Sequence, residues 1–511
     1  MAVRTTLPPD VAAGQRRRGT WPVGTLAWLT AAVSLVLAAN VRLSRALIVD
    51  SYYDLYAGRY LVRHGIPHRN LVTIAAHGAP WIDQQWLAHI AYYAAFAAGG
   101  YPAVAALSAA LVTAGFAVLA LTMARRGVPA TRMFAWTITA FAACLGNTQV
   151  RAQSFGYLFF AVTLWLVLDD SDSAAPRPPA SWPRSPRPRA RTWLVLPVLV
   201  LWANTHGSVL LGAALVGGYA ACRAAIAARR RCRTPALAYL VLAAAACAAV
   251  LCTPYGTATA GYYLRFGPNS ALDSYVAEWA PSLNAASTWI FLGAAAAVLT
   301  AAAVSWRRGA RPDPLLAALA VGLLGLALTA ARDEAWFGLA GSLLAADALA
   351  RAGGSRVPVL SAGFRRTTAA ALGALAAASL AALAVRTDLE FESQAPVRAI
   401  QVAAAVAARQ NDPAVLGDDY SGTAALWLAP ELTGRVGFDC RFEFFSATEL
   451  GAYFDFVLVR GHHWQRASRG YSVIVAASQR AALVRALIGL PGWRVAYHGR
   501  DGVVLVRMPA R

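Results

Sequence analysis

Residues 25–41 ("TLAWLTAAVSLVLAANV") form a mostly apolar run, and residues 49–58 ("VDSYYDLYAG") follow it with two carboxylates and three tyrosines. The apolar run is long enough to cross a bilayer as a helix. It lies behind the basic segment "GQRRRGT" (14–20) and lacks a small-x-small cleavage site, so we interpret it as a membrane anchor rather than a cleaved signal peptide. The chain therefore places Asp50 and Asp54 just beyond a membrane crossing.

The composition extends this interpretation to most of the chain. Of its 511 residues, 58% are hydrophobic and only 14% are charged, with a mean hydropathy of +0.47, whereas a soluble protein carries about 25% charged residues. Apolar segments recur at 25–42, 101–123, 131–146, 155–168, 193–204, 207–222, 236–252, 287–305, 313–330, 335–350 and 368–385. The sequence thus predicts a polytopic α-helical membrane protein with about 11 transmembrane helices.

The basic residues indicate how these segments are oriented. The net charge is +21, and all 46 basic residues are arginines. With a cytoplasmic N-terminus, 24 arginines fall in the inner tail and loops and eight in the outer loops, as the positive-inside rule requires. We therefore read the charge as a topology signal and expect no nucleic-acid partner. Eleven crossings place the C-terminus outside the cell (plasma) membrane.

These crossings divide the chain into three parts. We expect a cytoplasmic tail at 1–24, a transmembrane domain at 25–386 and an extracytoplasmic domain at 387–511. The transmembrane domain would contain a first outer loop at 45–100 and a Pro/Arg/Ser-rich cytoplasmic loop at 169–192, which we expect to be disordered.

The last part has the pattern of a soluble α/β domain. An Ala-rich helix at 395–410 precedes a strand-like segment at 414–420, and a further helix is expected near 477–489. Between them, "GRVGFD" (434–439) and "FDFVLVRG" (454–461) are further segments expected to contribute to the sheet. The pair "WRVAYHG" (493–499) and "GVVLVRM" (502–508) flanks a turn. The six cysteines show no CxxC pair and no metal-binding spacing.

Polar side chains collect at the predicted outer ends of the apolar segments. They are Asp50, Asp54, His64, His68, His77, Asp83, Arg151, Gln153, Asn204, His206, Asp273, Glu278, Arg332 and Asp333. Any one of them could be a helix cap or a solvated loop residue. Because ionisable groups near membrane depth tend to pair and to mark a site, the group as a whole indicates a functional site.

Asp50 and Asp54 are four residues apart and would share one face of a helix. Two carboxylates there suit a divalent ion such as Mg²⁺ or Mn²⁺, or a sugar hydroxyl, and one of them can act as a general base. Tyr52, Tyr53 and Tyr56 offer flat faces and hydroxyls that match a sugar ring. The alternative is a pair of acidic residues at a helix N-terminus, where the macrodipole favours them.

Other segments support a site on the same side. Residues 79–96 predict an amphipathic helix lying on the membrane surface, which "GGYP" (99–102) would end. Asn204 and His206 interrupt a long apolar stretch, as an outer turn or a broken helix would, and His206 fits a structural or a ligand-binding role equally well.

Three arginines would emerge at outer ends of apolar segments, at Arg151, Arg265 and Arg332. A convergent pair of them could clamp a lipid phosphate. The alternative is that each one reaches the lipid headgroups on its own.

A series of short motifs then suggests a family. They are "VDSYYDLYAGRYLVRHGIPHRN", "GAPWIDQQWLAHI", "RAQSFGYLF", "WANTHGSVLLG", "TPYG" with "YVAEWAP", "AARDEAWFGLAG", "VLGDDYSGTAALWL", "RVGFDCRFEFF", "FDFVLVRG" and "LPGWRVAYHGRDGVVLVR". In this order the chain resembles membrane proteins of the GT-C glycosyltransferase superfamily, and in particular a bacterial group with a C-terminal extracytoplasmic α/β domain.

The resemblance implies an enzyme that transfers sugar, with inversion, from a polyprenyl-phosphate donor to a cell-envelope glycan or protein at the outer face. It implies that Asp50 is the base, where the superfamily often has two adjacent acids and this chain has Val49 and Ser51 on either side. Asp54 or Asp83 would orient the substrate or a divalent ion.

The resemblance also implies that Arg151 and Arg332 neutralise the phosphate, and that Glu278 and Trp279 line the rim. Gln153, Asn204 and His206 complete the candidate substrate-binding residues. No other cofactor is indicated. The remaining partners expected are the surrounding membrane lipids.

Two alternatives remain. A non-catalytic GT-C-fold protein could bind glycan or assemble envelope components without transferring sugar. A transporter is disfavoured, because the inner halves of the apolar segments carry almost no polar residues.

Overall fold

The computed structural model describes most of the chain. The described residues are 23–174, 187–266, 281–282, 287–353, 360–411 and 413–509. The predicted tail therefore lies almost wholly outside the described part. Residues 175–186 of the predicted cytoplasmic loop also lie outside it.

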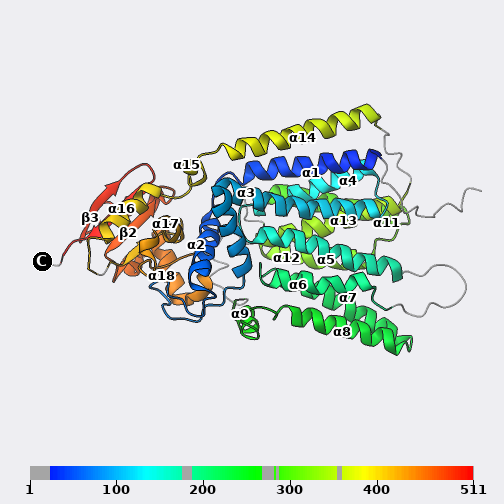
Figure 1. Cartoon of the computed structure of the whole chain (residues 1–511), viewed down its shortest axis with the longest axis horizontal. Coiled ribbons are helices and arrows are strands. Elements are labelled where there is room, and N and C mark those ends of the chain that lie inside the picture. Colours follow the sequence, from blue (N-terminus) through cyan, green and yellow to red (C-terminus); the bar gives the residue numbers. More distant parts are fainter. Residues whose placement is uncertain are drawn as a thin grey trace, which may run out of the picture.

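Apolar helices form a bundle whose members run along the long axis of the molecule (Figure 1). Each of the apolar segments expected from sequence falls on one of them. They are α1 (Val23–Leu43), the second part of α3 (Trp86–Arg125), α4 (Ala130–Ala143), α5 (Gln153–Ala174), α6 (Val195–Ala203), α7 (Val209–Arg229), α8 (Arg233–Ala249), α11 (Thr288–Arg307), α12 (Pro314–Thr329), α13 (Glu334–Arg351) and α14 (Ala362–Ala384). Within the described residues, six helices are individually long and apolar enough to cross a membrane.

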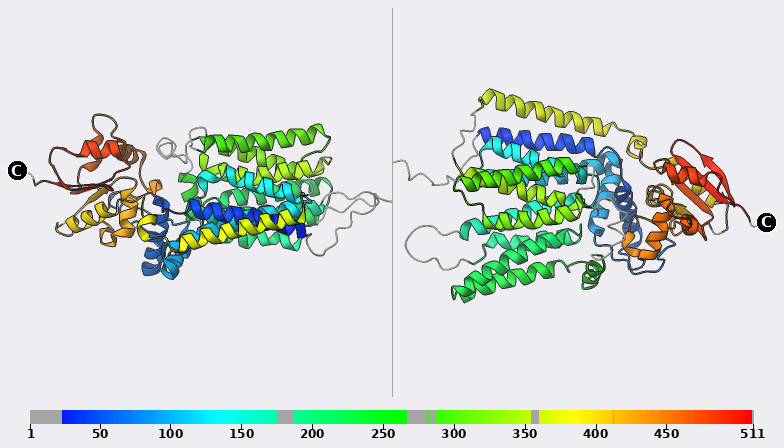
Figure 2. Two further views of the ribbon diagram at one scale, coloured as in Figure 1. Left: turned by 90° about the horizontal axis from the view of Figure 1, so that it is seen from above. Right: turned by 180° about the vertical axis from the view of Figure 1, so that it is seen from behind.

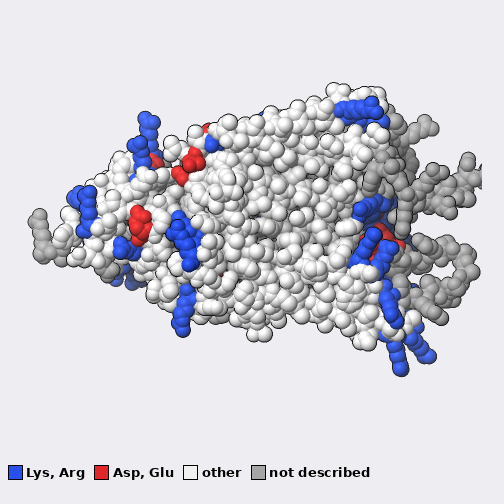
Figure 3. Space-filling model, viewed as in Figure 1, with Lys and Arg blue, Asp and Glu red and all other residues white. Residues whose placement is uncertain are grey.

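The surface of the bundle is that of an integral membrane protein. Large apolar side chains lie exposed on its outer helices, among them Trp289 and Trp306 on α11 and Val321 on α12. Figure 3 shows a broad band almost free of charged residues between two charged ends. Apolar surface of this extent is stable against lipid and would aggregate in water.

The end of the bundle next to the C-terminal residues, here called the domain end, carries a layer of its own. Helix α2 (Val49–His64) crosses the bundle direction there and packs beside the first part of α3 (Figure 1). Gly58 allows this contact, because a Cβ at that position would collide with the backbone carbonyl of His89. Helix α3 then bends at Gly99 and Gly100, the latter with φ of +64°, before it enters the bundle, as "GGYP" predicted.

A small mixed sheet follows the bundle. Its strand order is β1 (Val415–Gly417), β2 (Val473–Ala477), β4 (Gly502–Arg507) and β3 (Trp493–His498). Strand β1 is parallel to β2, and β4 is antiparallel to both β2 and β3. Helices α15 (Asp388–Phe391), α16 (Val397–Ala407), α17 (Ser421–Leu428), α18 (Ala447–Leu458) and α19 (Ala481–Leu487) accompany the sheet.

Two elements of this domain differ from the sequence expectation. Strand β2 was not expected, although it is buried along its whole length in the middle of the sheet. The segment 454–461 forms the end of helix α18 and the turn that follows it, and it does not contribute to the sheet.

The C-terminal domain is joined to the first loop by backbone and side-chain contacts. Ile74 and Ala75 donate backbone hydrogen bonds of 2.8 and 3.1 Å to Val436 and Gly437. The Arg59 guanidinium donates to two carbonyls of α17 and lies over the ring of Trp427. The first loop and the domain therefore share one hydrophobic cluster rather than packing as separate bodies.

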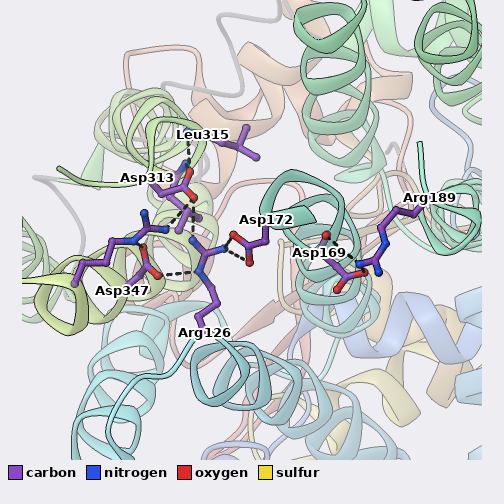
Figure 4. Close-up of polar contacts among 9 residues, drawn as sticks. Arg126, Asp169, Asp172, Arg189, Asp313, Leu315 and Asp347 are labelled. Atoms are coloured by element: carbon purple, nitrogen blue, oxygen red, sulfur yellow. Dashed lines mark hydrogen bonds and ion pairs between the residues drawn. The ribbon is translucent and has the colours of Figure 1, made fainter. Parts of the chain in front are cut away.

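The opposite end of the bundle, here called the far end, holds a buried polar network (Figure 4). The Arg126 guanidinium lies 2.8 to 2.9 Å from the carboxylates of Asp172, Asp313 and Asp347. Asp170 accepts hydrogen bonds from the hydroxyls of Thr192, Tyr219 and Tyr239, at 2.7 to 2.8 Å.

These contacts correct two expectations. Residues 169–174 continue helix α5 instead of beginning a disordered loop. The far end is also not bare of polar residues, because α5 carries Asp170 and Asp172, Asp313 caps α12 and α13 carries Asp347.

Candidate active site

The first turn of α2 carries an ion pair that joins it to α5. The NH1 atom of Arg151 lies 3.4 Å from the Oδ2 atom of Asp50. The Arg151 side chain is only 9% exposed and the Asp50 side chain is 39% exposed. The carboxylate can therefore meet a ligand from solvent, while the guanidinium is held inside the protein.

The turn before α5 is fixed by two further contacts. The Ser51 hydroxyl donates a hydrogen bond of 2.5 Å to the carbonyl of Val150. The Tyr92 hydroxyl donates one of 2.9 Å to the carbonyl of Arg151. Helices α2 and α3 thus both hold the residues that present the Arg151 side chain.

Asp54 lies one turn after Asp50 but in a different environment. It is 2% exposed and its Oδ1 atom lies 3.2 Å from Nε2 of His89. The other ring nitrogen of His89, Nδ1, lies 3.0 Å from Oδ2 of Asp83. The two carboxylates that sequence analysis proposed as substrate or metal ligands therefore both face one buried imidazole.

The charge of this cluster follows from its geometry. A neutral imidazole has one N–H, whereas both nitrogens of His89 face carboxylate oxygens, so the arrangement fits an imidazolium. Burial raises the pKa of the Asp54 carboxyl, and His89 and the backbone of Ala152 oppose that rise. The side chains of the cluster are at most 3% exposed, so they support the site from inside the protein, whereas the Asp50 carboxylate meets solvent.

Arg332 is held close to the same turn through its backbone. Gln153 donates to the Arg332 carbonyl at 3.4 Å, and Asn147 donates to the Ala331 carbonyl at 3.0 Å. Asn147 also accepts a hydrogen bond of 3.2 Å from Arg151. The structure therefore brings Asp50, Arg151, Gln153 and the backbone of Arg332 into one neighbourhood.

The side chain of Asn204 makes structural hydrogen bonds. Its Oδ1 accepts a hydrogen bond of 2.6 Å from the Trp86 indole, and its Nδ2 donates to the carbonyls of Val200 and Cys252. The polar atoms of its side chain thus tie the end of α6 to the start of α3. His206 bonds through Nδ1 to the Ser208 hydroxyl at 2.7 Å, within the turn that "WANTHGS" predicted.

Two candidate residues and the expected divalent ion stay predictions. Glu278 and Trp279 lie outside the described residues. Within the described part of the chain, no group of three or more His, Cys, Asp or Glu side chains is arranged to hold a metal ion. Asp54 and Asp83 do not fit Mg²⁺ or Mn²⁺ as they stand, because their oxygens face the N–H groups of His89.

The C-terminal domain reaches this layer through Arg441. Its guanidinium is buried, pairs with Asp439 and donates to Asn70 at 3.0 Å. It also lies 4.3 Å from the ring centre of Trp81. These contacts favour a fold-stabilising role for Asp439 and Arg441.

Glu443 follows in the short helix η7 (Phe442–Phe444). Burial raises the pKa of Glu443 to about 7, against the opposing effect of Arg441. The charge of this carboxyl group therefore changes near neutral pH, so the stability of the folded protein depends on pH in that range.

His89 is the site residue that sequence analysis missed. It stands in the segment interpreted as a membrane-surface helix, where an imidazole is unremarkable. The available signal was the spacing of Asp83 and His89, which a turn and the first helical turn bring together.

Comparisons with known proteins agree with this architecture. No protein-family model matches the chain, and no curated protein is similar to it in sequence. The oligosaccharyltransferase of Archaeoglobus fulgidus in its apo form matches 95% of this chain and 74% of its own, with a TM-score of 0.52 and 11% identity.

ArnT from Cupriavidus metallidurans gives a similar match in two structures. Bound to undecaprenyl phosphate, it covers 96% of this chain and 99% of its own, with a TM-score of 0.50 and 12% identity. In the apo state the coverage is 94% and 97%, with a TM-score of 0.50 and 13% identity. At such identities the similarity shows the fold alone, and it extends over nearly the whole chain: this protein has the fold of the GT-C glycosyltransferases.

Proposed function

We propose that the protein is a membrane glycosyltransferase that moves a sugar from a polyprenyl-phosphate donor to a cell-envelope acceptor. The observation that carries the proposal is the pairing of Asp50 with Arg151 at the domain end of a GT-C fold. A partly exposed carboxylate beside a buried guanidinium supplies the base and the phosphate-binding cation that such a transfer needs.

The reaction proceeds by direct displacement. An acceptor hydroxyl oxygen attacks the anomeric carbon, its proton passes to the Asp50 carboxylate, and the bond from that carbon to the phosphate oxygen breaks. The lipid phosphate leaves with the bonding electrons. Arg151 neutralises the charge that develops on this phosphate, and Arg332, whose backbone is held at the same turn, is proposed as a second cation. Attack on the face opposite the leaving group inverts the sugar.

Two features support a lipid-linked donor. The site lies where α2 meets the apolar bundle, so a polyprenyl chain can remain in the bilayer while its phosphate reaches Arg151. The structural neighbour ArnT was crystallised with undecaprenyl phosphate. By the positive-inside rule the domain end faces outward, where a cell-envelope acceptor is found.

The test is transfer from polyprenyl-phosphate sugars by purified protein and by its D50N variant. The loss of the base predicts a fall in turnover of about 100-fold or more, with lipid phosphate binding retained. The control is D169N, which removes an exposed carboxylate paired with Arg189 at the far end. Transfer by D50N at the wild-type rate would exclude Asp50 as the base.

A single outcome would favour the alternative function. If the wild-type protein binds polyprenyl phosphate but transfers no sugar from any donor offered, it acts as a glycan-binding or assembly protein on the same fold. The proposed function and the alternative both require Arg151 to bind the lipid phosphate. R151Q should therefore weaken that binding whichever function is correct.

A further inference from the structure

His89 takes no part in the proposed transfer step, yet its side chain contacts two segments of the first loop. It is buried on α3, between Asp54 on α2 and Asp83 in the turn that precedes α3. The ring of Tyr53 stands edge-on to it at 4.8 Å. One side chain thus joins three consecutive parts of the layer that carries the site.

The contact with Asp54 leads directly to the candidate base. Asp54 and Asp50 lie one helical turn apart on α2, and Ser51 between them bonds to Val150. The backbone of Ala152 faces the Asp54 carboxylate. Whatever fixes Asp54 therefore also fixes the first turn of α2 against the residues on either side of Arg151.

A second residue of α3, close to His89, holds the backbone of Arg151. Tyr92 follows His89 by almost one turn and donates its hydroxyl to the Arg151 carbonyl. Helix α3 therefore positions both members of the Asp50–Arg151 pair. His89 acts on Asp50 through Asp54, and Tyr92 holds the backbone of Arg151.

We infer that His89 is a positioning residue: by holding Asp54 it sets the start of α2, and with it Asp50, against Arg151. Its effect on catalysis rests on the proposed function, whereas the positioning itself does not. The competing role is that His89 only secures the start of α3 through Asp83.

The two nitrogens of His89 can be separated by substitution. The amide nitrogen of an asparagine lies near the position of Nδ1, and that of a glutamine lies near the position of Nε2. H89N can thus keep a donor toward Asp83 and loses the one toward Asp54. H89Q does the reverse. Both remove the same charge, so each is the control for the other.

Positioning through Asp54 predicts different kinetics for the two variants. In H89N, turnover should fall about 100-fold with little change in KM, because a displacement of about 1 Å at a reacting group has that effect. H89Q should retain turnover to within about tenfold of wild type. Equal turnover in the two variants, or lower turnover in H89Q, would overturn the inference.

Hydrogen exchange provides a readout that needs no activity. The amides of residues 50–54 and 150–154 should exchange faster in H89N than in H89Q, and those of the first turn of α3 should show the opposite order. If wild-type protein transferred no sugar, this comparison would still decide the positioning role, and only the proposed function would fail. Equal exchange of residues 50–54 in both variants would contradict the inference.

Discussion

Arg151 lies 3.4 Å from Asp50, although 101 positions separate them in the sequence. The guanidinium is anchored by Asn147 on its other side, so the geometry of the pair is set mainly by the arginine. A fixed cation beside a partly exposed carboxylate is the arrangement that the proposed transfer, with its phosphate leaving group, requires.

The first prediction concerns this cation. R151Q should lower turnover of polyprenyl-phosphate sugars by about 100-fold or more, because the leaving phosphate loses its buried partner. The measurement is the steady-state transfer rate of purified protein. R45Q is the matched control, since Arg45 is exposed in the first loop, and it should transfer at close to the wild-type rate. Equal loss in both variants would contradict a specific role for Arg151.

The second prediction concerns the contact of α2 with α3. G58A should destabilise the protein by about 2 kcal/mol, because the added Cβ meets the His89 carbonyl and the Tyr93 side chain. The measurement is thermal unfolding in detergent. G217A is the control, because a Cβ at Gly217 on α7 meets no atom within 4 Å, and alanine favours a helix. An unchanged Tm for G58A would mean that the two helices are not in close contact.

The third prediction concerns pH. The folded protein holds the Glu443 proton up to about pH 7, while the unfolded chain releases it near the ordinary value of about 4.3. Between these values the folded state binds more protons, so raising the pH through this window lowers stability. Tm should fall by a few degrees from pH 5 to pH 8 in wild type, and by less in E443Q. The same slope in both proteins would remove Glu443 as the cause.

The fourth prediction concerns the far end. R126Q should destabilise the bundle by about 3 kcal/mol, because three carboxylates lose their shared cation. Thermal unfolding again provides the measurement. R230Q, at an exposed position after α7, should leave Tm unchanged. A stable R126Q would show that the aspartates are accommodated without the arginine.

The fifth prediction concerns orientation. With the native cysteines replaced, R469C in the C-terminal domain and R230C at the far end place one exposed thiol at each end of the molecule. In intact cells a membrane-impermeant maleimide should label R469C and not R230C, because the topology predicted from the positive-inside rule places the domain end outside. The opposite pattern would reverse the topology and exclude an outer acceptor.

The bundle could be predicted from sequence because apolar length is a local property. Each expected apolar segment falls on a helix, and the bend at Gly99 and Gly100 follows from two adjacent glycines. Strand β2 was missed because, buried on both faces, it lacks the alternation that marks a half-exposed strand. Figure 2 shows the resulting sheet at the end of the elongated bundle.

The site was predictable only in part, for a different reason. Asp50 and Arg151 stood out because ionisable groups near membrane depth tend to pair and to mark a site. Whether a carboxylate faces solvent or another side chain depends on the neighbouring helix. Asp54 looked equivalent to Asp50 in sequence, but the structure buries Asp54 against His89 and leaves Asp50 partly exposed beside Arg151.

The backbone pairing of Ile74 and Ala75 with Val436 and Gly437 has a consequence for biogenesis. During translation the first loop emerges more than 350 residues before the segment it pairs with exists, so it must stay incompletely folded until the last quarter of the chain is made. A protein truncated after α14 would insert its helices but lack the scaffold for the loop that carries Asp50.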